Sequence, residues 1–286
     1  MKIDSTQILE GAGTWVEAHA GALPAAPLVR AVKVATGLVS GPSTASLSLG
    51  ASRFGGEPDL PPVAAWPRWR EGPLSFLAQL DLATLPDASG LLPDTGTLLF
   101  FFDSQKQPWG FDPADEGGAR VVYSEADPRV LVRTAFPEDL PTAARFAARS
   151  LEARPVATLP TDGERAGLEL EEDEAAELYA ELEAGITGLE AEHRVLGWPA
   201  ELQNPMELEC QLVSNGLYCG NSAGYQSEAA QRLAPGADDW ILLCQLDSDE
   251  TLGWMWGDLG RLYFWIKRGH LAARRFDRVW TVLQCG

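Results

Sequence analysis

Two stretches of the chain repeat each other in the same order, and this repetition limits the possible folds more than any other feature. Residues 76–81 read FLAQLD and residues 242–247 read LLCQLD. Residues 94–101 (DTGTLLFF) then match residues 258–265 (DLGRLYFW), so the two offsets are 166 and 164 residues. A loop with Gly and Pro precedes each copy, at residues 55–58 and 197–199. Self-similarity of this kind predicts two copies of one supersecondary unit: loop, strand, turn, strand.

The sequence around the two copies favours an α+β fold. Gly and Pro number 28 and 20 among 286 residues, so turns are frequent and strands are short. We expect a mainly antiparallel sheet built from the two pseudo-repeats, with helices at its periphery. The expected organisation is a single domain over residues 1–286. Its parts are pseudo-repeat one at about 50–125, an acidic helical insertion at about 164–193, and pseudo-repeat two at about 194–286.

Hydrophobic periodicity predicts further elements outside the matched segments. Apolar residues at helical spacing predict helices over residues 5–20 and 141–151. Alternating or apolar stretches predict strands over residues 28–35, 207–213 and 278–283. These elements would surround the repeated units.

The repeated strand carries Gln and Asp amid apolar neighbours. Because side chains alternate along a strand, Leu77, Gln79 and Asp81 are expected to share one face, and residues 243, 245 and 247 likewise. A buried Gln without a hydrogen-bond partner costs roughly 1–3 kcal/mol. Two interpretations stay open. The glutamines bond the backbone of the adjoining Pro-rich loops, or they help to line a ligand pocket at the repeat junction, for which the candidate residues are Gln79, Asp81, Gln245, Asp247, Trp256 and Asp258.

Charge narrows the choice of partners. The chain has 41 acidic and 22 basic residues and a net charge of −19. Such a chain repels nucleic-acid phosphates and anionic membrane surfaces and attracts a basic protein partner. A long acidic helix is expected within residues 169–193, and its candidate partner-binding residues are Glu174, Glu177, Glu181 and Glu183. That polar side is either a solvated face kept for solubility or an electrostatic landing surface.

Residue types that carry catalysis or bind metals are sparse. None of the four Cys lies in a C-x-x-C motif, and the three His at positions 19, 193 and 270 are far apart, so we expect no metal site and no cofactor. Residues 220–224 match G-x-S-x-G, but His270 alone follows them and no clear strand precedes them. With no signal peptide and no run of 18 apolar residues, a cytoplasmic protein with reduced thiols is expected.

Several short motifs resemble those of the bacterial YwqG-like family, a family of unknown function. The first group is Ser52-x-Phe54-Gly55-Gly56-x-Pro58-x-Leu60-Pro61, Trp66-Pro67 and Phe76-Leu77-x-Gln79-Leu80. The later group is Leu196-Gly197 with Gln203 and Met206, Leu243-x-Gln245-x-Asp247-Ser248, Trp256-Gly257-Asp258-x-Gly260, Phe276 and Gln284. The resemblance covers roughly residues 45–286. It implies an intracellular α+β protein and an immunity or partner-binding role, and it carries no catalytic residue over to this chain.

Two functional hypotheses follow. The first is a non-enzymatic acidic binding protein of the immunity type, favoured by the charge, the few catalytic residue types and the resemblance. The alternative is a small-molecule enzyme or ligand sensor that uses a pocket at the junction of the pseudo-repeats.

Overall fold

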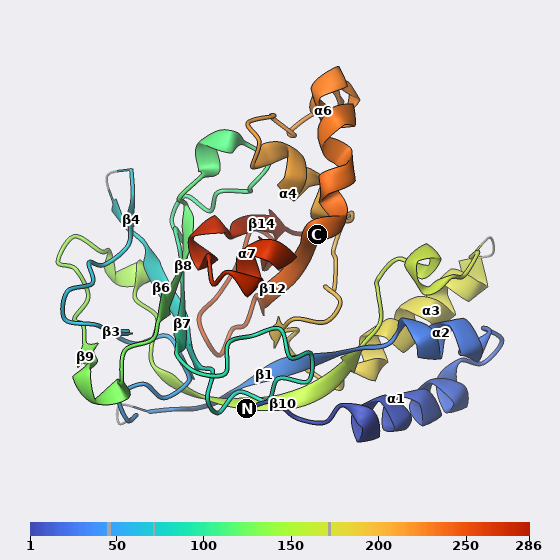
Figure 1. Ribbon diagram of the computed structural model, residues 1–286, viewed down its shortest axis with the longest axis horizontal. Helices are drawn as coiled ribbons and strands as arrows, with labels where there is room; N and C mark the ends of the chain where they lie inside the picture. The colour runs from blue at the N-terminus through green and yellow to red at the C-terminus, as the bar shows by residue number, and fades with distance from the viewer. Residues whose placement is uncertain (45–46, 71, 171–172) are drawn as a thin grey trace.

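The computed structural model describes residues 1–44, 47–70, 72–170 and 173–286 of the chain. They form helices and one large antiparallel sheet (Figure 1), so the prediction of mixed helix and antiparallel sheet is confirmed. The strands of this sheet are β1 (Lys33–Ser43), β2 (Arg53–Phe54), β6 (Ser75–Asp81), β7 (Thr97–Phe102), β8 (Ala119–Ser124), β10 (Arg149–Thr158), β11 (Arg194–Val195), β12 (Trp240–Asp247), β13 (Arg261–Lys267) and β14 (Trp280–Gln284).

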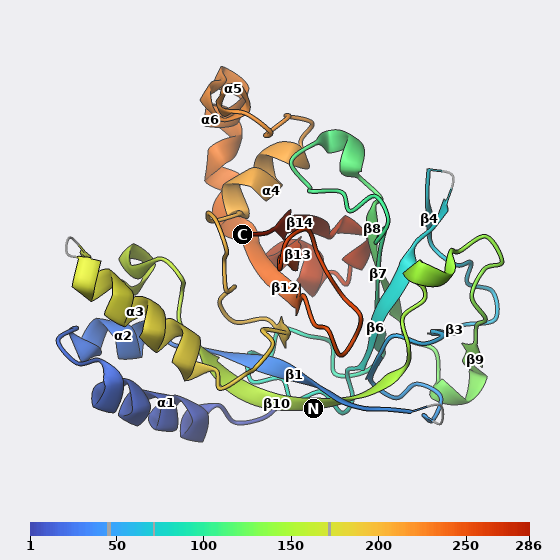
Figure 2. The ribbon, with the colours of Figure 1, turned by 180° about the vertical axis from the view of Figure 1, so that it is seen from behind.

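Two small sheets and seven α-helices complete the described part of the chain. The small sheets pair β3 (Asp59–Leu60) with β9 (Val132–Arg133), and β4 (Arg68–Trp69) with β5 (Gly72–Pro73). The helices are α1 (Thr6–His19), α2 (Ala25–Ala31), α3 (Asp173–Ile186), α4 (Glu207–Val213), α5 (Ser222–Gln226), α6 (Glu228–Leu233) and α7 (Arg268–Ala272). Helices α1, α2 and α3 lie together beside the β1–β10 ribbon, whereas α4, α5 and α6 lie at the far side of β12 and β14 (Figures 1 and 2).

The order of strands in the sheet is symmetric about its centre. It runs β14-β13-β12-β11-β1-β10-β2-β6-β7-β8, with the long strands β1 and β10 in the middle. In the chain, the short strand β2 follows β1 and the short strand β11 follows β10. In the sheet these partners are exchanged: β1 pairs with β11, and β10 pairs with β2. The matched sequences occupy equivalent places, in β6 with β7 and in β12 with β13. The predicted strands are therefore confirmed, while an origin of the two halves by duplication stays a prediction.

A β-bulge changes the predicted faces of both repeated strands. The register of β6 against β7 shifts between Phe76 and Ala78, and that of β12 against β13 shifts between Leu242 and Cys244. A bulge adds one unpaired residue, so the alternation of side chains slips at that point. Leu77 and Leu243 consequently belong to the central core. The expectation that they share a face with the glutamines is therefore wrong.

The sheet curls until it is nearly barrel-shaped, and its inner faces pack on each other. Phe100 of β7 lies 5.2 Å, between ring centroids, from Phe264 of β13. Trp254 and Trp256, from the connection between β12 and β13, are buried in the same core. Trp256 packs edge-on against Phe102 of β7. These tryptophans are part of the packing that keeps the curled sheet closed on itself.

Three predicted elements are wrong. Residues 207–213 form helix α4 and not a strand, with Glu207 and Glu209 in its first turn, where carboxylates favour the helix dipole. Residues 28–35 are divided between the end of α2 and the start of β1. Residues 141–151 hold a 3₁₀ turn (Thr142–Ala144) and the start of β10. In each segment tertiary packing overrides a weak local preference.

The acidic stretch forms a shorter helix than expected. Helix α3 covers Asp173–Ile186, and the expected helical residues 171 and 172 lie outside the described part of the chain. Its apolar side packs on α1 and the end of β10 through Leu178, Tyr179 and Leu182. Glu183 is half-buried, and the electrostatic interaction of its carboxyl is with Arg194 and Arg261, so it does not belong to the exposed face that was predicted. Exposed carboxylates do occupy the other three positions, Glu174, Glu177 and Glu181.

Candidate functional site

The first glutamine bonds the Pro-rich loop that covers its strand. Gln79 is fully buried, and its Oε1 accepts a hydrogen bond of 2.9 Å from the backbone N–H of Asp59. Its Nε2 donates to the carbonyl of Ala51 and to Oδ2 of Asp59, both at 3.0 Å. All polar atoms of the Gln79 side chain therefore have protein partners. This agrees with the interpretation in which the glutamine bonds the backbone of the adjoining Pro-rich loop.

The second glutamine has the same kind of partners in the other half of the sheet. Gln245 is also fully buried, and its Oε1 accepts a hydrogen bond of 2.9 Å from the backbone N–H of Ala200. Its Nε2 donates to the carbonyl of Glu192 at 2.7 Å. In both halves the backbone N–H belongs to the residue directly after a proline, Pro58 or Pro199.

Beside each glutamine lies a buried arginine that the sequence analysis missed. Arg53 pairs across the ladder with Gln79, and Arg194 pairs with Gln245. Arg53 donates to Asp59 at 3.0 Å, and Arg194 donates to the carbonyl of Trp198 at 2.9 Å. A signal was present, because both arginines begin the pattern Arg-x-x-Gly-x-Pro, at residues 53–58 and 194–199.

The two Arg-x-x-Gly-x-Pro loops also share a backbone shape. Gly55 and Leu196 have φ of 56° and 60°, and the following Gly56 and Gly197 have φ of 76° and 75°. A Cβ on Gly197 would lie 2.6 Å from Cβ of Ala35 on β1, so only glycine fits there. The loops are thus equivalent turns that bring a proline over the repeated strand.

Ionised side chains surround the first glutamine. Burial raises the pKa of Asp59, but hydrogen bonds from Arg133, Arg53 and Gln79 outweigh it and lower the pKa to about 2. Around the second glutamine, burial lowers the pKa of Arg194 to about 10. The Gln79 network thus joins Arg53 and Arg133 to the Asp59 carboxylate, and the buried Nε of Arg53 has no hydrogen-bond partner among the described residues.

The six predicted ligand-binding residues are not brought to one place. Gln79 and Gln245 belong to separate networks, with β2, β10, β1 and β11 between their strands. Asp247 accepts from Arg261 at 2.9 Å, while Asp81 accepts from the backbone N–H of Ala83 in a turn at 3.0 Å. Trp256 is buried and donates to the carbonyl of Asp247, and Asp258 is exposed. A ligand role for the six stays a prediction, and the cavities described below are lined by other residues.

One hollow of about 500 Å³ is lined by the buried His193 together with polar side chains such as Asp249 and Thr251. His193 Nδ1 accepts a hydrogen bond of 2.9 Å from the backbone N–H of Asp247, which places the ring proton on Nε2, 3.3 Å from Asp249. Hydrogen bonds from His193 and Thr251 lower the pKa of Asp249 although burial raises it. Both ring nitrogens are engaged, so His193 has no free nitrogen to act as a base.

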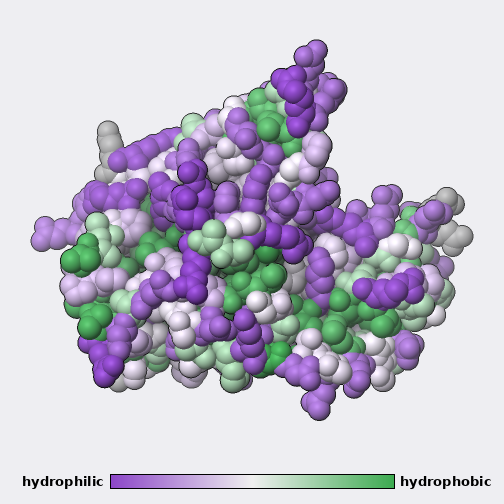
Figure 3. Space-filling model, in the orientation of Figure 1, coloured by the Kyte–Doolittle hydropathy of each residue, from purple (hydrophilic) through white to green (hydrophobic). Residues whose placement is uncertain are grey.

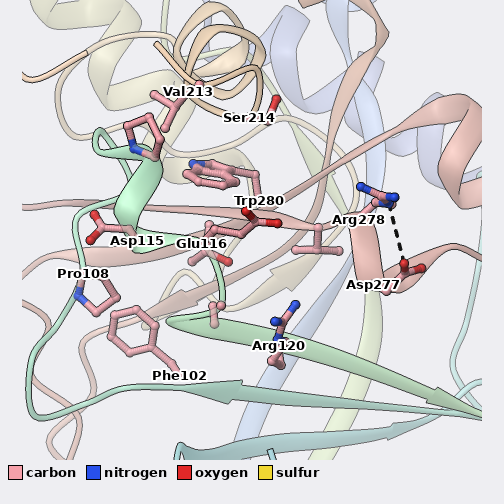
Figure 4. Close-up of a pocket in the computed structure, with 16 residues that line it drawn as sticks. Phe102, Pro108, Asp115, Glu116, Arg120, Val213, Ser214, Asp277, Arg278 and Trp280 are labelled. Carbon is pink, nitrogen blue, oxygen red and sulfur yellow. Dashed lines mark ion pairs between the residues drawn. The ribbon is translucent and has the colours of Figure 1, made fainter. Parts of the chain in front are cut away.

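A second hollow, of about 310 Å³, lies where the two edge strands of the sheet approach each other (Figure 4). Arg120 of β8 and Arg278 point toward its interior. Asp115, Glu116 and Asp277 line the same space, and burial raises the pKa of Asp115. The acidic residues outnumber the basic ones here, so this hollow has no net attraction for an anion.

A third hollow, of about 220 Å³, has the opposite balance, and we call it the Lys33 cavity. It lies on the outer face of the sheet between β1, β12, β13, α4 and the loop after β11, and the cations Lys33, Arg165 and Arg268 line it. Arg165 is paired with Glu207 at 2.6 Å and lies 3.5 Å from Glu201. Within the described residues, the side chains of Lys33 and Arg268 have no carboxylate partner.

Tryptophans form the walls of the Lys33 cavity. The Lys33 ammonium lies 3.1 Å from the centre of the Trp198 ring, a close cation–π contact. Two hydrogen bonds fix Trp198: its Nε1 donates to the carbonyl of Ala31 at 2.7 Å, and its backbone N–H donates to Thr158 at 3.0 Å. The ring is therefore a rigid support for the ammonium.

One residue that lines this cavity has an N–H group without a hydrogen-bond acceptor among the described residues. Trp265 of β13 is 1% exposed, lines the cavity, and its buried Nε1 has no hydrogen-bond acceptor among the described residues. A buried donor left without an acceptor costs roughly 1–3 kcal/mol. Trp240, on the neighbouring strand, differs, because its Nε1 donates to Gln211 at 3.0 Å. The Trp265 indole N–H is therefore enclosed by the protein and unsatisfied among the described residues.

Ionisation in and near the cavity is shifted by burial and by neighbouring charge. Partial burial, Arg268 and Arg165 lower the pKa of Lys33 to about 8. Burial raises the pKa of Glu201 to about 7, although Arg165 opposes this. An anion placed beside Lys33 would offset the positive charge of the two arginines that lowers its pKa.

The described residues contain neither a candidate metal site nor a helix able to span a membrane. No group of three or more His, Cys, Asp or Glu side chains that could hold a metal ion occurs in the described ranges. None of the helices in those ranges combines the length and the apolar character needed to cross a membrane. All four cysteines are free thiols, and all but Cys285 are buried.

Residues 52–285 match a known family described as "Domain of unknown function (DUF1963)". The chain belongs to this family. No curated protein matches the chain. Membership of the DUF1963 family assigns no activity, and the YwqG-like name stays a resemblance.

The DUF1963 region contains the two glutamine networks and most of the Lys33 cavity, including Arg165, Trp198, Trp265 and Arg268. Lys33 lies before this region, at the start of β1. Because β1 pairs with both β10 and β11, the preceding segment is built into the centre of the DUF1963 sheet. The cavity is therefore shared between the family region and the segment before it.

Proposed function

We propose that the protein binds a small anionic ligand in the Lys33 cavity. The observation that carries this proposal is a pair of cations, Lys33 and Arg268, which line one cavity and have no carboxylate partner among the described residues. An anion bound between them would supply the missing counter-charge. Three basic side chains against the lining acids Glu207 and Asp238 make this hollow locally positive in a chain of net charge −19.

The proposed role is binding and not catalysis. Lys33 and Arg268 recognise charge, and Trp198 holds the ammonium in place. These groups position an anion, and the proposal assigns no nucleophile or general base to the cavity. It retains the ligand-sensor alternative of the sequence analysis at a different set of residues, and we propose the cytoplasm as the compartment.

Calorimetric titration with sulfate tests the proposal. Wild-type protein is expected to bind sulfate, and Arg268→Gln and Lys33→Gln are expected to weaken binding by about tenfold or more, since a hydrogen bond to a charged group is worth roughly 1.5–3 kcal/mol. Arg232→Gln is the matched control, because Arg232 is an exposed arginine of α6 that lies 3.7 Å from Glu228 and does not line the cavity. Equal weakening by all three variants, or no sulfate binding by the wild type, would contradict the proposal.

A second candidate function is docking of a basic protein on α3. The observation that favours it is the row of exposed carboxylates Glu174, Glu177 and Glu181, in a helix without a single basic residue. Carboxylates at i and i+4 destabilise an isolated helix by a few tenths of a kcal/mol, so such a row has a small cost. An immunity-type role would use this row for electrostatic steering toward the partner.

Pull-down from the native lysate tests this second proposal. A partner captured through α3 should be lost as salt rises from about 0.05 to 0.5 M and should be lost at low salt from the triple variant Glu174→Gln, Glu177→Gln, Glu181→Gln. A triple variant of other exposed acids, Glu125→Gln, Asp139→Asn and Glu228→Gln, is the charge-matched control. An unchanged set of captured proteins in the α3 variant would remove this helix from consideration.

We also infer that the two halves of the sheet are copies of one unit. The matched sequences, the equivalent bulges and the paired φ angles of the two Arg-x-x-Gly-x-Pro loops support this inference. On this view the Lys33 cavity is specific to the second half, because the loop of the first half is occupied by the ion pair of Arg53 and Asp59.

A further inference from the structure

The Lys33 cavity has a neighbour with different walls. A hollow of about 260 Å³ adjoins it, and we call this hollow the Leu91 pocket. The two spaces share Lys33, Gly197 and Arg268, together with Ile241 and Leu242 of β12. The unpaired cations therefore stand at the boundary between the two spaces and face both.

Apolar side chains from three separate segments line the Leu91 pocket. Leu9 comes from α1, Val32 and Val34 lie at the start of β1, and Leu91 comes from the connection between β6 and β7. Leu9 and Leu91 are 38% and 43% exposed, which is unusual for leucines that face the same hollow. The β6–β7 connection passes in front of β1 in Figure 1, and hydrophobic residues gather in this part of Figure 3.

The two spaces complement each other chemically. The Lys33 cavity offers positive charge, whereas the Leu91 pocket is lined mostly by hydrocarbon. Apart from the shared cations, the polar residues of the Leu91 pocket are Ser5 and Ser89. An inorganic anion would fill only the first space. Small-molecule sites usually comprise roughly 300–1,000 Å³ with apolar walls and a few polar groups that set the orientation, and the joined spaces meet this description while neither does alone.

We propose that the natural ligand is an amphipathic small anion, with its sulfate-, phosphate- or carboxylate-like head at Lys33 and Arg268 and an alkyl or acyl chain in the Leu91 pocket. This inference rests on the proposed function and adds the class of ligand to it. The chain covers the exposed faces of Leu9 and Leu91, and the head supplies a counter-charge to Lys33 and Arg268. Apolar burial then adds to the affinity that charge provides.

Titration with three matched probes tests the class of ligand. Octyl sulfate carries head and chain, inorganic sulfate carries the head alone, and octyl glucoside carries the chain without charge; each is used below its micelle concentration. Octyl sulfate is expected to bind at least about tenfold more tightly than sulfate, since burying two methylene groups already corresponds to that factor. Octyl glucoside is expected to bind more weakly than octyl sulfate by a similar factor. Octanoate and octyl phosphate, compared with octyl sulfate, identify the preferred head group.

Variants at exposed leucines separate the two spaces without threatening the fold. Leu9→Ser and Leu91→Ser should weaken octyl sulfate binding by about fivefold or more and leave sulfate binding unchanged. Val63→Ser is the control, because Val63 is 96% exposed and lies outside the pocket.

The outcomes distinguish the two proposals. If sulfate binds but octyl sulfate binds no more tightly, or if the leucine variants change nothing, the amphipathic ligand is wrong and the anion site stands. If neither sulfate nor octyl sulfate binds, the proposed function itself fails. If octyl glucoside binds as tightly as octyl sulfate, the pocket is a general apolar site and the head-group assignment is wrong.

Discussion

Gln79 and Gln245 each accept a hydrogen bond of 2.9 Å from the backbone N–H of the residue that follows a proline, Asp59 in one half of the sheet and Ala200 in the other. Each bond joins a loop to the outer face of a repeated strand. Proline has no N–H, and the glutamine reaches the next available donor. The same side chain thus performs the same task in both halves.

Replacing Gln245 tests this structural role. Gln245→Leu should lower the free energy of unfolding by roughly 1–3 kcal/mol, because the N–H of Ala200 and the carbonyl of Glu192 are left buried without partners. Urea denaturation measures the change. The exposed Gln231→Leu on α6 is the control and should change stability little. Near-wild-type stability of Gln245→Leu would show that these backbone groups find other partners.

Asp59 predicts a pH-dependent stability. Its pKa of about 2 in the fold lies below the value of about 3.9 in an unfolded chain, so the ionised carboxylate stabilises the fold above about pH 4. This contribution is lost as the pH falls through about 2. At pH 7, Asp59→Asn should cost about 3–5 kcal/mol, because it leaves the buried Arg53 without its counter-ion.

The loss of stability caused by Asp59→Asn should therefore depend on pH. The difference in unfolding free energy is expected to narrow as the pH falls from about 4 toward 2. Asp127→Asn, at an exposed pair with Arg129, is the control and should change stability little. A gap that stays constant over this range would mean that Asp59 does not act through its charge.

Two tryptophan variants isolate the unpartnered indole. Trp280 donates from Nε1 to the carbonyl of Gly110 at 2.9 Å, whereas Trp265 has no acceptor. Trp265→Phe removes an unsatisfied donor and Trp280→Phe removes a satisfied one. Trp280→Phe should thus destabilise the protein more, by about 1–2 kcal/mol. Equal losses of stability in the two variants would show that the Trp265 N–H has a partner in the folded protein.

Sulfate binding should weaken as the Lys33 ammonium loses its proton. The pKa of Lys33 is about 8, and sulfate keeps its charge, so affinity should fall between about pH 8 and 9.5. Arg268, Arg165 and Glu207 also act on the Lys33 ammonium, and Glu201, with a pKa of about 7, is already ionised over this range. Lys33→Arg should bind sulfate with little pH dependence, because arginine stays charged. An equal slope in both proteins would show that Lys33 does not hold the anion.

The sequence determined the repeated strands by itself. Alternation and self-similarity identify β6, β7, β12 and β13 because the side chains of a strand report its environment at every second residue. The spacing of Gln79 and Gln245 from their Pro-containing loops also predicts that each glutamine bonds backbone groups. What the sequence did not reveal is the bulge at Leu77 and Leu243, since a one-residue slip in pairing leaves no local signature.

Tertiary structure decided the candidate site. Lys33 and Arg268 come from opposite ends of the chain, Arg165 comes from a 3₁₀ helix (Gly163–Ala166), and Trp198 comes from the loop after β11. No periodicity links such residues, because the closing of the curled sheet, and not local spacing, brings them together. Helix α4, expected as a strand, supplies Glu207 to the same cavity. Local pattern records which face of an element is buried, whereas the charge balance of a cavity depends on which distant elements pack around it.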